Sequence, residues 1–112
     1  VTGSETERAY DIGVAGPHRL ARALEGLAWE PDVIVCAAGR EAALPVVLAG
    51  LVEPPVIAVP TSVGYGHGGQ GEAALKGVLQ SCAPLLTVNI DAGLVAGLCA
   101  SKIARLAGRG RR

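Results

Sequence analysis

Methionine is absent from this chain of 112 residues, even at the first position, and residues 2–8 form a polar opening that begins no recognisable folding unit. We therefore expect the chain to be part of a longer protein. No apolar run approaches the roughly 18 to 20 residues that span a bilayer. The chain also does not open on the charged and then apolar pattern of a leader. These absences predict a cytoplasmic protein that has no membrane partner.

An excess of charge of either sign is also missing, because ten acidic residues balance ten basic ones. A net charge of zero argues against nucleic acid or an anionic membrane as the main partner. The one asymmetry is a group of arginines near the end of the chain, namely Arg105, Arg109, Arg111 and Arg112. We expect residues 107–112 to form a solvated, poorly ordered basic tail.

The three cysteines, Cys36, Cys82 and Cys99, are an odd number and include no Cys-x-x-Cys pair. This pattern indicates neither a disulfide framework nor a zinc knuckle. Each cysteine is then a buried small hydrophobe or a reactive thiol. Cys36 and Cys99 fall inside an expected strand and an expected helix, where we expect burial to disfavour the thiolate. Cys82 follows the end of a helix, near the presumed cleft.

Half of the residues are hydrophobic, which is ample for the core of one domain over residues 1–112. Short apolar runs predict strands at 33–36, 56–59 and 87–90, and a strand end at 7–10. Helical spacing of apolar residues predicts helices at 17–29, 42–52, 72–80 and from 91 or 92 to about 106. The alternation predicts an α/β fold, in which a parallel sheet carries helices on both faces as three layers.

Ligands of open parallel sheets bind in the crevice outside the carboxyl ends of the strands. Residues 39–41 and 60–65 come just after two predicted strands, so we expect the chemistry there. The glycine-rich stretch 64–71 precedes a predicted helix, where backbone amides can approach a phosphate. The same stretch could instead be a mobile lid or a tight connection, since it lacks the lysine and hydroxyl of a P-loop.

Several single residues allow a functional and a plain interpretation. Glu41 is a carboxylate at the end of a predicted buried strand, but it could be an exposed acid in the first turn of the next helix. Cys82 could be a nucleophile or a packing residue. His18 and Arg19 at a helix start could bind an anion or form a solvated surface pair.

Asn89 and Asp91, at the end of the last predicted strand, allow a similar choice. They could belong to a ligand site, or they could simply cap the helix that follows. Composition and spacing leave these alternatives open.

A resemblance to a known family adds to this interpretation. Five blocks carry it in order: residues 10–19 (YDIGVAGPHR), 39–45 (GREAALP), 56–66 (VIAVPTSVGYG), 81–83 (SCA) and 88–97 (VNIDAGLVAG). Together they cover nearly the whole chain. The sequence resembles the LarB family, which makes the first intermediate of the nickel-pincer nucleotide cofactor. It is more distantly similar to PurE, the aminoimidazole ribonucleotide carboxylase/mutase family.

The LarB resemblance implies carboxylation of the pyridinium ring of nicotinic acid adenine dinucleotide with CO₂ or bicarbonate as its source. Hydrolysis of the phosphoanhydride then releases AMP and pyridinium-3,5-biscarboxylic acid mononucleotide. By the same resemblance Cys82 would be the nucleophile and Glu41 the base that removes a ring proton. The residues implied to bind the substrate are His18, Arg19, Gly39, Arg40, Thr61, Ser62, Gly64, Tyr65, Gly66, Asn89 and Asp91.

Both families form rings of identical subunits, so the resemblance implies a homo-oligomer with a PurE-like, flavodoxin-like fold. It implies no tightly bound cofactor and no protein metal site, although Mg²⁺ could accompany the pyrophosphate of the substrate.

The chain departs from the PurE pattern at one diagnostic point, because Ala43 stands where that family has the histidine of its A-A-H-L-P turn. The pair His18 and Arg19 still matches the segment with which PurE holds a ligand phosphate. The initial strand and its serine-rich loop have no counterpart here, so we expect the domain to be incomplete at its N-terminus. A PurE-type carboxylase and a non-catalytic nucleotide-binding module remain the alternatives.

Overall fold

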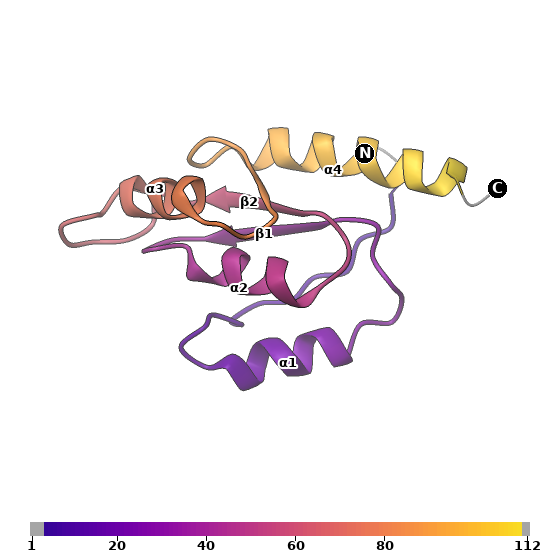
Figure 1. Cartoon of the computed structure of the whole chain (residues 1–112), viewed down its shortest axis with the longest axis horizontal. Helices are drawn as coiled ribbons and strands as arrows, with labels where there is room; N and C mark the ends of the chain where they lie inside the picture. The colour runs from indigo at the N-terminus through magenta and orange to yellow at the C-terminus, as the bar shows by residue number, and fades with distance from the viewer. Residues whose placement is uncertain (1–3, 111–112) are drawn as a thin grey trace.

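A parallel sheet of three strands lies at the centre of the structure, a computed structural model that describes residues 4–110 (Figure 1). In chain order the strands are β1 (Ile34–Ala38), β2 (Val56–Pro60) and β3 (Leu86–Thr87). Their order in the sheet is the same, with Ile34 opposite Val56 and Ile57 opposite Leu86. All carboxyl ends therefore lie at one edge of the sheet.

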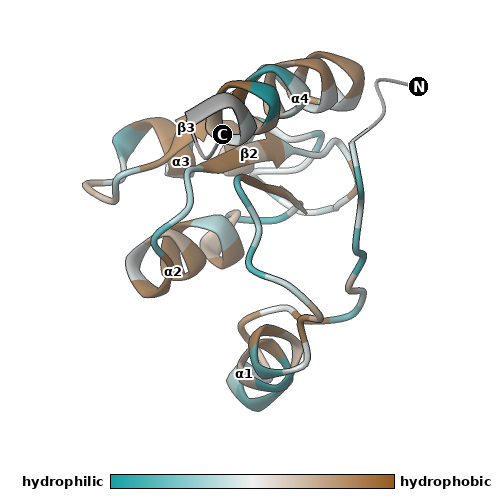
Figure 2. Cartoon of the chain, turned by 90° about the vertical axis from the view of Figure 1, so that its right-hand side faces the viewer, coloured by the Kyte–Doolittle hydropathy of each residue, from teal (hydrophilic) through white to brown (hydrophobic). Residues whose placement is uncertain are grey.

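Four helices surround this sheet, namely α1 (Pro17–Glu25), α2 (Ala43–Leu51), α3 (Glu72–Gln80) and α4 (Gly93–Gly110). Helices α2 and α3 contact each other and pack on one side of the sheet, whereas α4 runs along the other side (Figures 1 and 2). Helix α1 lies beyond α2, and its Leu20 belongs to the buried cluster that includes Leu48. The predicted α/β fold with helices on both faces of a parallel sheet is confirmed.

Strand β2 shows why two helical layers form. All five of its residues are buried, and alternate side chains point to opposite faces of a strand. Val56 joins the cluster on the α2 side and Ala58 the cluster with α3, whereas Ile57 and Val59 pack with Ala96 of α4. A strand that is apolar at every position requires cover on both faces, and α2, α3 and α4 provide it.

Two predicted helices have different ends in the structure. Helix α1 stops at Glu25 rather than near residue 29, because Gly26 follows and its N–H bonds back to the carbonyl of Arg22. Glycine has the greatest backbone freedom to lose in a helix, so it favours an end there. Helix α4 continues to Gly110, so residues 107–110 of the predicted tail are helical. Arg111 and Arg112 lie outside the described residues.

Two of the predicted strands, at residues 7–10 and 87–90, also differ from the structure. Residues 7–10 form no strand, and Tyr10 is 78% exposed, because no strand lies beside them to accept a ladder of hydrogen bonds. Within residues 4–110, β1 pairs only with β2. Strand β3 ends at Thr87, because the Asn89 side chain accepts a bond from the next backbone N–H and Asp91 has a left-handed backbone with φ of 60°.

None of the helices in the described part of the chain has the length and apolar character needed to traverse a bilayer.

Candidate functional site at the carboxyl edge of the sheet

The loops that follow β1 and β2 lie directly against each other. The backbone N–H of Thr61 donates a 3.0 Å hydrogen bond to the carbonyl of Ala38. A Cβ at Gly39 would lie 2.5 Å from the carbonyl oxygen of Val63 and 3.0 Å from Oγ1 of Thr61, so only glycine allows this approach. The structure thus brings Gly39 and Thr61, which were predicted separately, into one close contact.

The loop after β3 is tied to the same place. The N–H of Ser62 donates a 2.8 Å hydrogen bond to Oδ1 of Asp91, and the N–H of Asp91 bonds to the carbonyl of Pro60 at 2.8 Å. The side-chain and backbone hydrogen bonds from Ser62 hold the pKa of Asp91 below its usual value. Asn89 instead accepts a bond from the N–H of Ile90. Both side chains therefore shape this loop, and their contact with a ligand stays a prediction.

Glu41 stands between two residues with left-handed backbones. Arg40 has φ of 51° and Ala42, the N-cap of α2, has φ of 52°. Such a conformation costs about 1 to 2 kcal/mol for an ordinary residue. Helix α2 begins only at Ala43 and has no acid in its first turn, so the plain interpretation of Glu41 as a first-turn acid is wrong. The exposed carboxylate is presented at the carboxyl edge of β1 by a strained turn.

Arg40 reaches across to the loop after β2. Its guanidinium carbon lies 4.8 Å from the centroid of the Tyr65 ring, which is a cation–π stack. Tyr65 is 81% exposed. Two predicted binding residues from neighbouring strands thus meet at the surface of this edge.

The glycine-rich stretch 64–71 is a series of turns that leads into α3. The N–H of Gly69 bonds to the carbonyl of Gly66, and the N–H of Ala73 bonds to that of Gly68. Gly71 has φ of 86° and packs so closely on Ile90 that a Cβ would lie 2.7 Å from a methyl carbon. The stretch is therefore a tight connection in this structure, and contacts of Gly64 and Gly66 with a phosphate stay a prediction.

Comparison with known proteins agrees with this architecture. A family model described as AIR carboxylase matches residues 4–110. The chain belongs to the AIR carboxylase family. It is also 46% identical over 109 residues to the uncharacterized protein MJ0165 of Methanocaldococcus jannaschii. That match covers 95% of this chain and 41% of the relative, so the chain spans less than half of the relative's length.

The two predicted anion-binding residues at the start of α1 are not hydrogen-bonded or ion-paired to this site within residues 4–110. His18 is exposed, and the Arg19 guanidinium forms a 2.8 Å ion pair with Asp11. Among the described residues, no hydrogen bond or ion pair joins α1 to the loops after β1, β2 and β3. The structure therefore does not link His18 and Arg19 to Glu41, and their role as an anion site stays a prediction.

The exposure of the cysteines differs from expectation at Cys99. Cys36 is buried in β1 as predicted, and burial raises the pKa of its thiol to about 11. Cys99 was expected to be buried inside a helix, but it is exposed on α4. Cys82 is exposed as well. Exposure alone therefore does not distinguish Cys82 from Cys99 in this AIR carboxylase family domain. The place of Cys82 in the fold decides whether it can act at the site.

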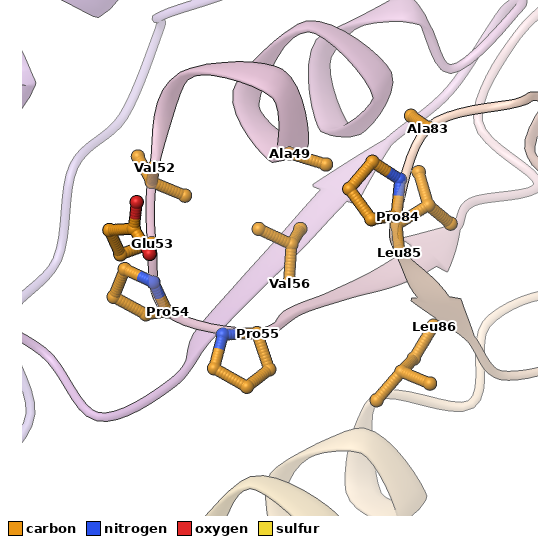
Figure 3. A pocket seen from close by; sticks show the side chains of 10 residues that line it. All are labelled: Ala49, Val52, Glu53, Pro54, Pro55, Val56, Ala83, Pro84, Leu85 and Leu86. Carbon is orange, nitrogen blue, oxygen red and sulfur yellow. The ribbon is translucent and has the colours of Figure 1, made fainter.

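Cys82 comes after α3 and before β3, so it does not follow the carboxyl end of a strand. The next residues, from Ala83 onward, line an open groove of about 440 Å³ at the amino edge of the sheet (Figure 3). The full lining is Ala49, Val52, Glu53, Pro54, Pro55, Val56, Ala83, Pro84, Leu85 and Leu86. The side chains that line the groove are apolar apart from Glu53. The groove lies at the opposite edge of the sheet from the loop with Glu41, so within one copy Cys82 does not lie near the presumed cleft as predicted.

One positioning residue was missed by the sequence analysis. A Cβ at Gly77, in the middle of α3, would lie 2.6 Å from the carbonyl oxygen of Glu41. The signal that could have revealed it is a glycine inside a helical pattern, which often marks a close approach.

Within residues 4–110, no group of three or more His, Cys, Asp and Glu side chains is arranged to hold a metal ion.

Proposed function

We propose that the protein carboxylates the pyridinium ring of nicotinic acid adenine dinucleotide and hydrolyses its phosphoanhydride, as the first step toward a nickel-pincer nucleotide cofactor. Membership of the AIR carboxylase family supports a carboxylase role in general. The finer reaction rests on the LarB resemblance and on the chemistry of Glu41 and Cys82. The single observation that carries it is the strained presentation of the Glu41 carboxylate at the carboxyl edge.

The proposed reaction needs a nucleophile and a base. A pyridinium ring is an electrophile, whereas CO₂ requires a carbon nucleophile. Addition of the Cys82 thiolate to the ring gives a neutral enamine, whose carbon then attacks CO₂. Glu41 takes the proton from the carboxylated carbon, and the thiolate leaves with its electron pair to restore the aromatic ring. The net change replaces a ring hydrogen by a carboxylate and releases one proton.

The positions of the two residues bear on how this could happen. Glu41 follows the carboxyl end of β1, whereas Cys82 precedes the amino end of β3. Strand β1 has five residues, so the two edges of the sheet are separated by about 13 Å of strand. A nucleophile and a base that act on one ring must lie much closer together. We therefore propose a homo-oligomer in which Cys82 of one copy approaches the Glu41 edge of another.

The remainder of the substrate would be held by the carboxyl-edge loops. Backbone and side-chain donors of Thr61 and Ser62, with the loop that contains Asp91, are candidates for the dinucleotide phosphates. His18 and Arg19 stay candidates too, although Arg19 would have to leave Asp11 or share it with the ligand. The described residues provide no metal cluster, so Mg²⁺ would arrive with the pyrophosphate of the substrate.

The test is product formation by the full-length protein from nicotinic acid adenine dinucleotide and bicarbonate labelled with carbon-13. The proposal expects labelled pyridinium-3,5-biscarboxylic acid mononucleotide together with AMP. Binding of the dinucleotide without incorporation of label would instead favour a non-catalytic nucleotide-binding module.

A PurE-type activity on an aminoimidazole ribonucleotide is the second candidate, and the family match favours it. Ala43 speaks against it, because an alanine has no group that can transfer a proton. The two candidates are separated by incubating the protein with each substrate and with a thiol-blocking reagent. Only the pyridinium reaction requires a free thiol.

A further inference from the structure

We propose that Arg40, held in place by Tyr65, recognises the carboxylate of the pyridinium ring and so selects the acid form of the dinucleotide over the amide form. This inference rests on the proposed function and names a specificity-determining residue for it. The geometry of the Arg40 and Tyr65 pair carries it.

The guanidinium of Arg40 is positioned but has no anionic partner. It stacks on the ring of Tyr65 with 4.8 Å between its central carbon and the ring centroid. Among the described side chains, no carboxylate forms an ion pair with it, although Arg19 and Lys76 each have one. A stacked guanidinium still offers the N–H groups on its edge, and these form the planar fork that binds a carboxylate through two parallel hydrogen bonds.

The local backbone restrains the Cα positions from which both side chains of the stack extend. Arg40 has φ of 51°, which directs its side chain away from the course that a strand or helix would give it. On the other loop, a Cβ at Gly69 would lie 3.5 Å from Cα of Tyr65, so the turn 66–69 packs against the tyrosine backbone. The two loops also meet at Gly39 and Val63, as described above. A pre-organised guanidinium loses less freedom when it binds a ligand.

The position of Arg40 in the chain indicates which anion it would bind. It directly precedes Glu41, the proposed base that removes a proton from the ring. Both side chains are exposed at the carboxyl edge, so they could act on neighbouring parts of one ligand. The group beside the reacting carbon of nicotinic acid is its carboxylate, and in nicotinamide that group is a neutral amide. A cationic fork distinguishes these two forms by charge.

The experiment compares dissociation constants for nicotinic acid adenine dinucleotide and nicotinamide adenine dinucleotide, measured by calorimetry on the full-length protein. Arg40→Met removes the fork and keeps an unbranched apolar stem. We expect it to weaken binding of the acid form by about tenfold or more and of the amide form by less than about twofold. Arg40→Lys should restore part of the preference, because it keeps the charge without the fork.

Tyr65 provides the matched pair of variants. Tyr65→Phe keeps the ring and should preserve the preference for the acid form. Tyr65→Leu removes the stack and should reduce that preference by a factor of about two to five, as expected for an exposed cation–π contact. The acid-to-amide ratio is the informative quantity, because a merely structural change would weaken both ligands alike.

Three results would overturn the inference, and they are distinguishable. An equal loss for both dinucleotides in Arg40→Met would mean that the guanidinium contacts a phosphate. Unchanged binding of both would mean that Arg40 is a surface residue. If the wild-type protein binds neither dinucleotide, the proposed function itself fails and this inference fails with it.

Discussion

The backbone N–H of Ser62 donates a 2.8 Å hydrogen bond to the carboxylate of Asp91 and thereby joins the loops that follow β2 and β3. The side-chain and backbone hydrogen bonds from Ser62 favour the charged carboxylate, which is why the pKa of Asp91 lies below its usual value. The folded protein therefore binds this proton less tightly than the unfolded chain does. The stabilisation is complete above about pH 4, the ordinary range for aspartate, and is lost as the pH falls through the folded-state pKa.

Variants of Asp91 test this contact. Asp91→Asn keeps an oxygen acceptor and tolerates the left-handed backbone, whereas Asp91→Ala loses the acceptor and strains at φ of 60°. We expect thermal unfolding temperatures to fall in the order wild type, Asp91→Asn, Asp91→Ala. We also expect the acid-induced loss of stability below pH 4 to be smaller in both variants. An Asp91→Ala protein as stable as the wild type would show that the loops are held by other contacts.

Gly39 should tolerate no side chain. A Cβ there would force Val63 and Thr61 away, at a cost of about 1 to 3 kcal/mol in the free energy of unfolding. Gly97→Ala in α4 is the matched control, because nothing lies within 4 Å of its added Cβ. It should stabilise the protein by about 0.5 to 1 kcal/mol. Urea denaturation measures both, and equal effects of the two substitutions would contradict the close packing of the loops.

Glu41→Gln should separate chemistry from binding. The amide keeps the size of the side chain but cannot accept the ring proton, so carboxylation should fall by roughly 10² or more while dinucleotide affinity is retained. Single-turnover assays and calorimetry on the same preparations provide the two quantities. Carboxylation within about twofold of the wild-type rate would remove Glu41 from the mechanism.

If Glu41 of one copy and Cys82 of another form one active site, two inactive variants should complement each other. Glu41→Gln and Cys82→Ser proteins should each be inactive, whereas hetero-oligomers formed by co-expression should recover activity at about a quarter of the sites. That fraction follows because an intact site needs Glu41 from one copy and Cys82 from another. Activity no greater than that of the single variants would place both residues within one copy.

The sequence predicted the parts of the fold that depend on periodicity. Helix α3 has the predicted bounds, because its apolar spacing starts directly after a stretch of glycines and stops before Ser81. The position of Cys82 was missed, although the predicted elements already contained it. A residue between a helix and the next parallel strand lies toward the amino edge of the sheet, and Cys82 lies between predicted helix 72–80 and predicted strand 87–90.

The candidate site was predicted only in part. The rule for parallel sheets correctly brought the loops with Gly39 and Thr61 together. The left-handed turn at Arg40 and Ala42 and the exposure of Cys99 were not predictable, because they depend on tertiary packing that no local pattern in the sequence records. A glycine inside a helical pattern could have signalled the close approach at Gly77, but the sequence does not show that its neighbour is Glu41.

The central claim is that the Cys82 thiolate adds to the pyridinium ring. The most direct test is intact-protein mass spectrometry of the full-length protein incubated with nicotinic acid adenine dinucleotide, followed by peptide mapping. Cys99→Ser is the matched control for an exposed thiol, and Cys36 should not react because burial raises its pKa to about 11. The account predicts an adduct on Cys82 in the wild type and in Cys99→Ser, and neither adduct nor carboxylation in Cys82→Ser. Carboxylation by Cys82→Ser at the wild-type rate would contradict it.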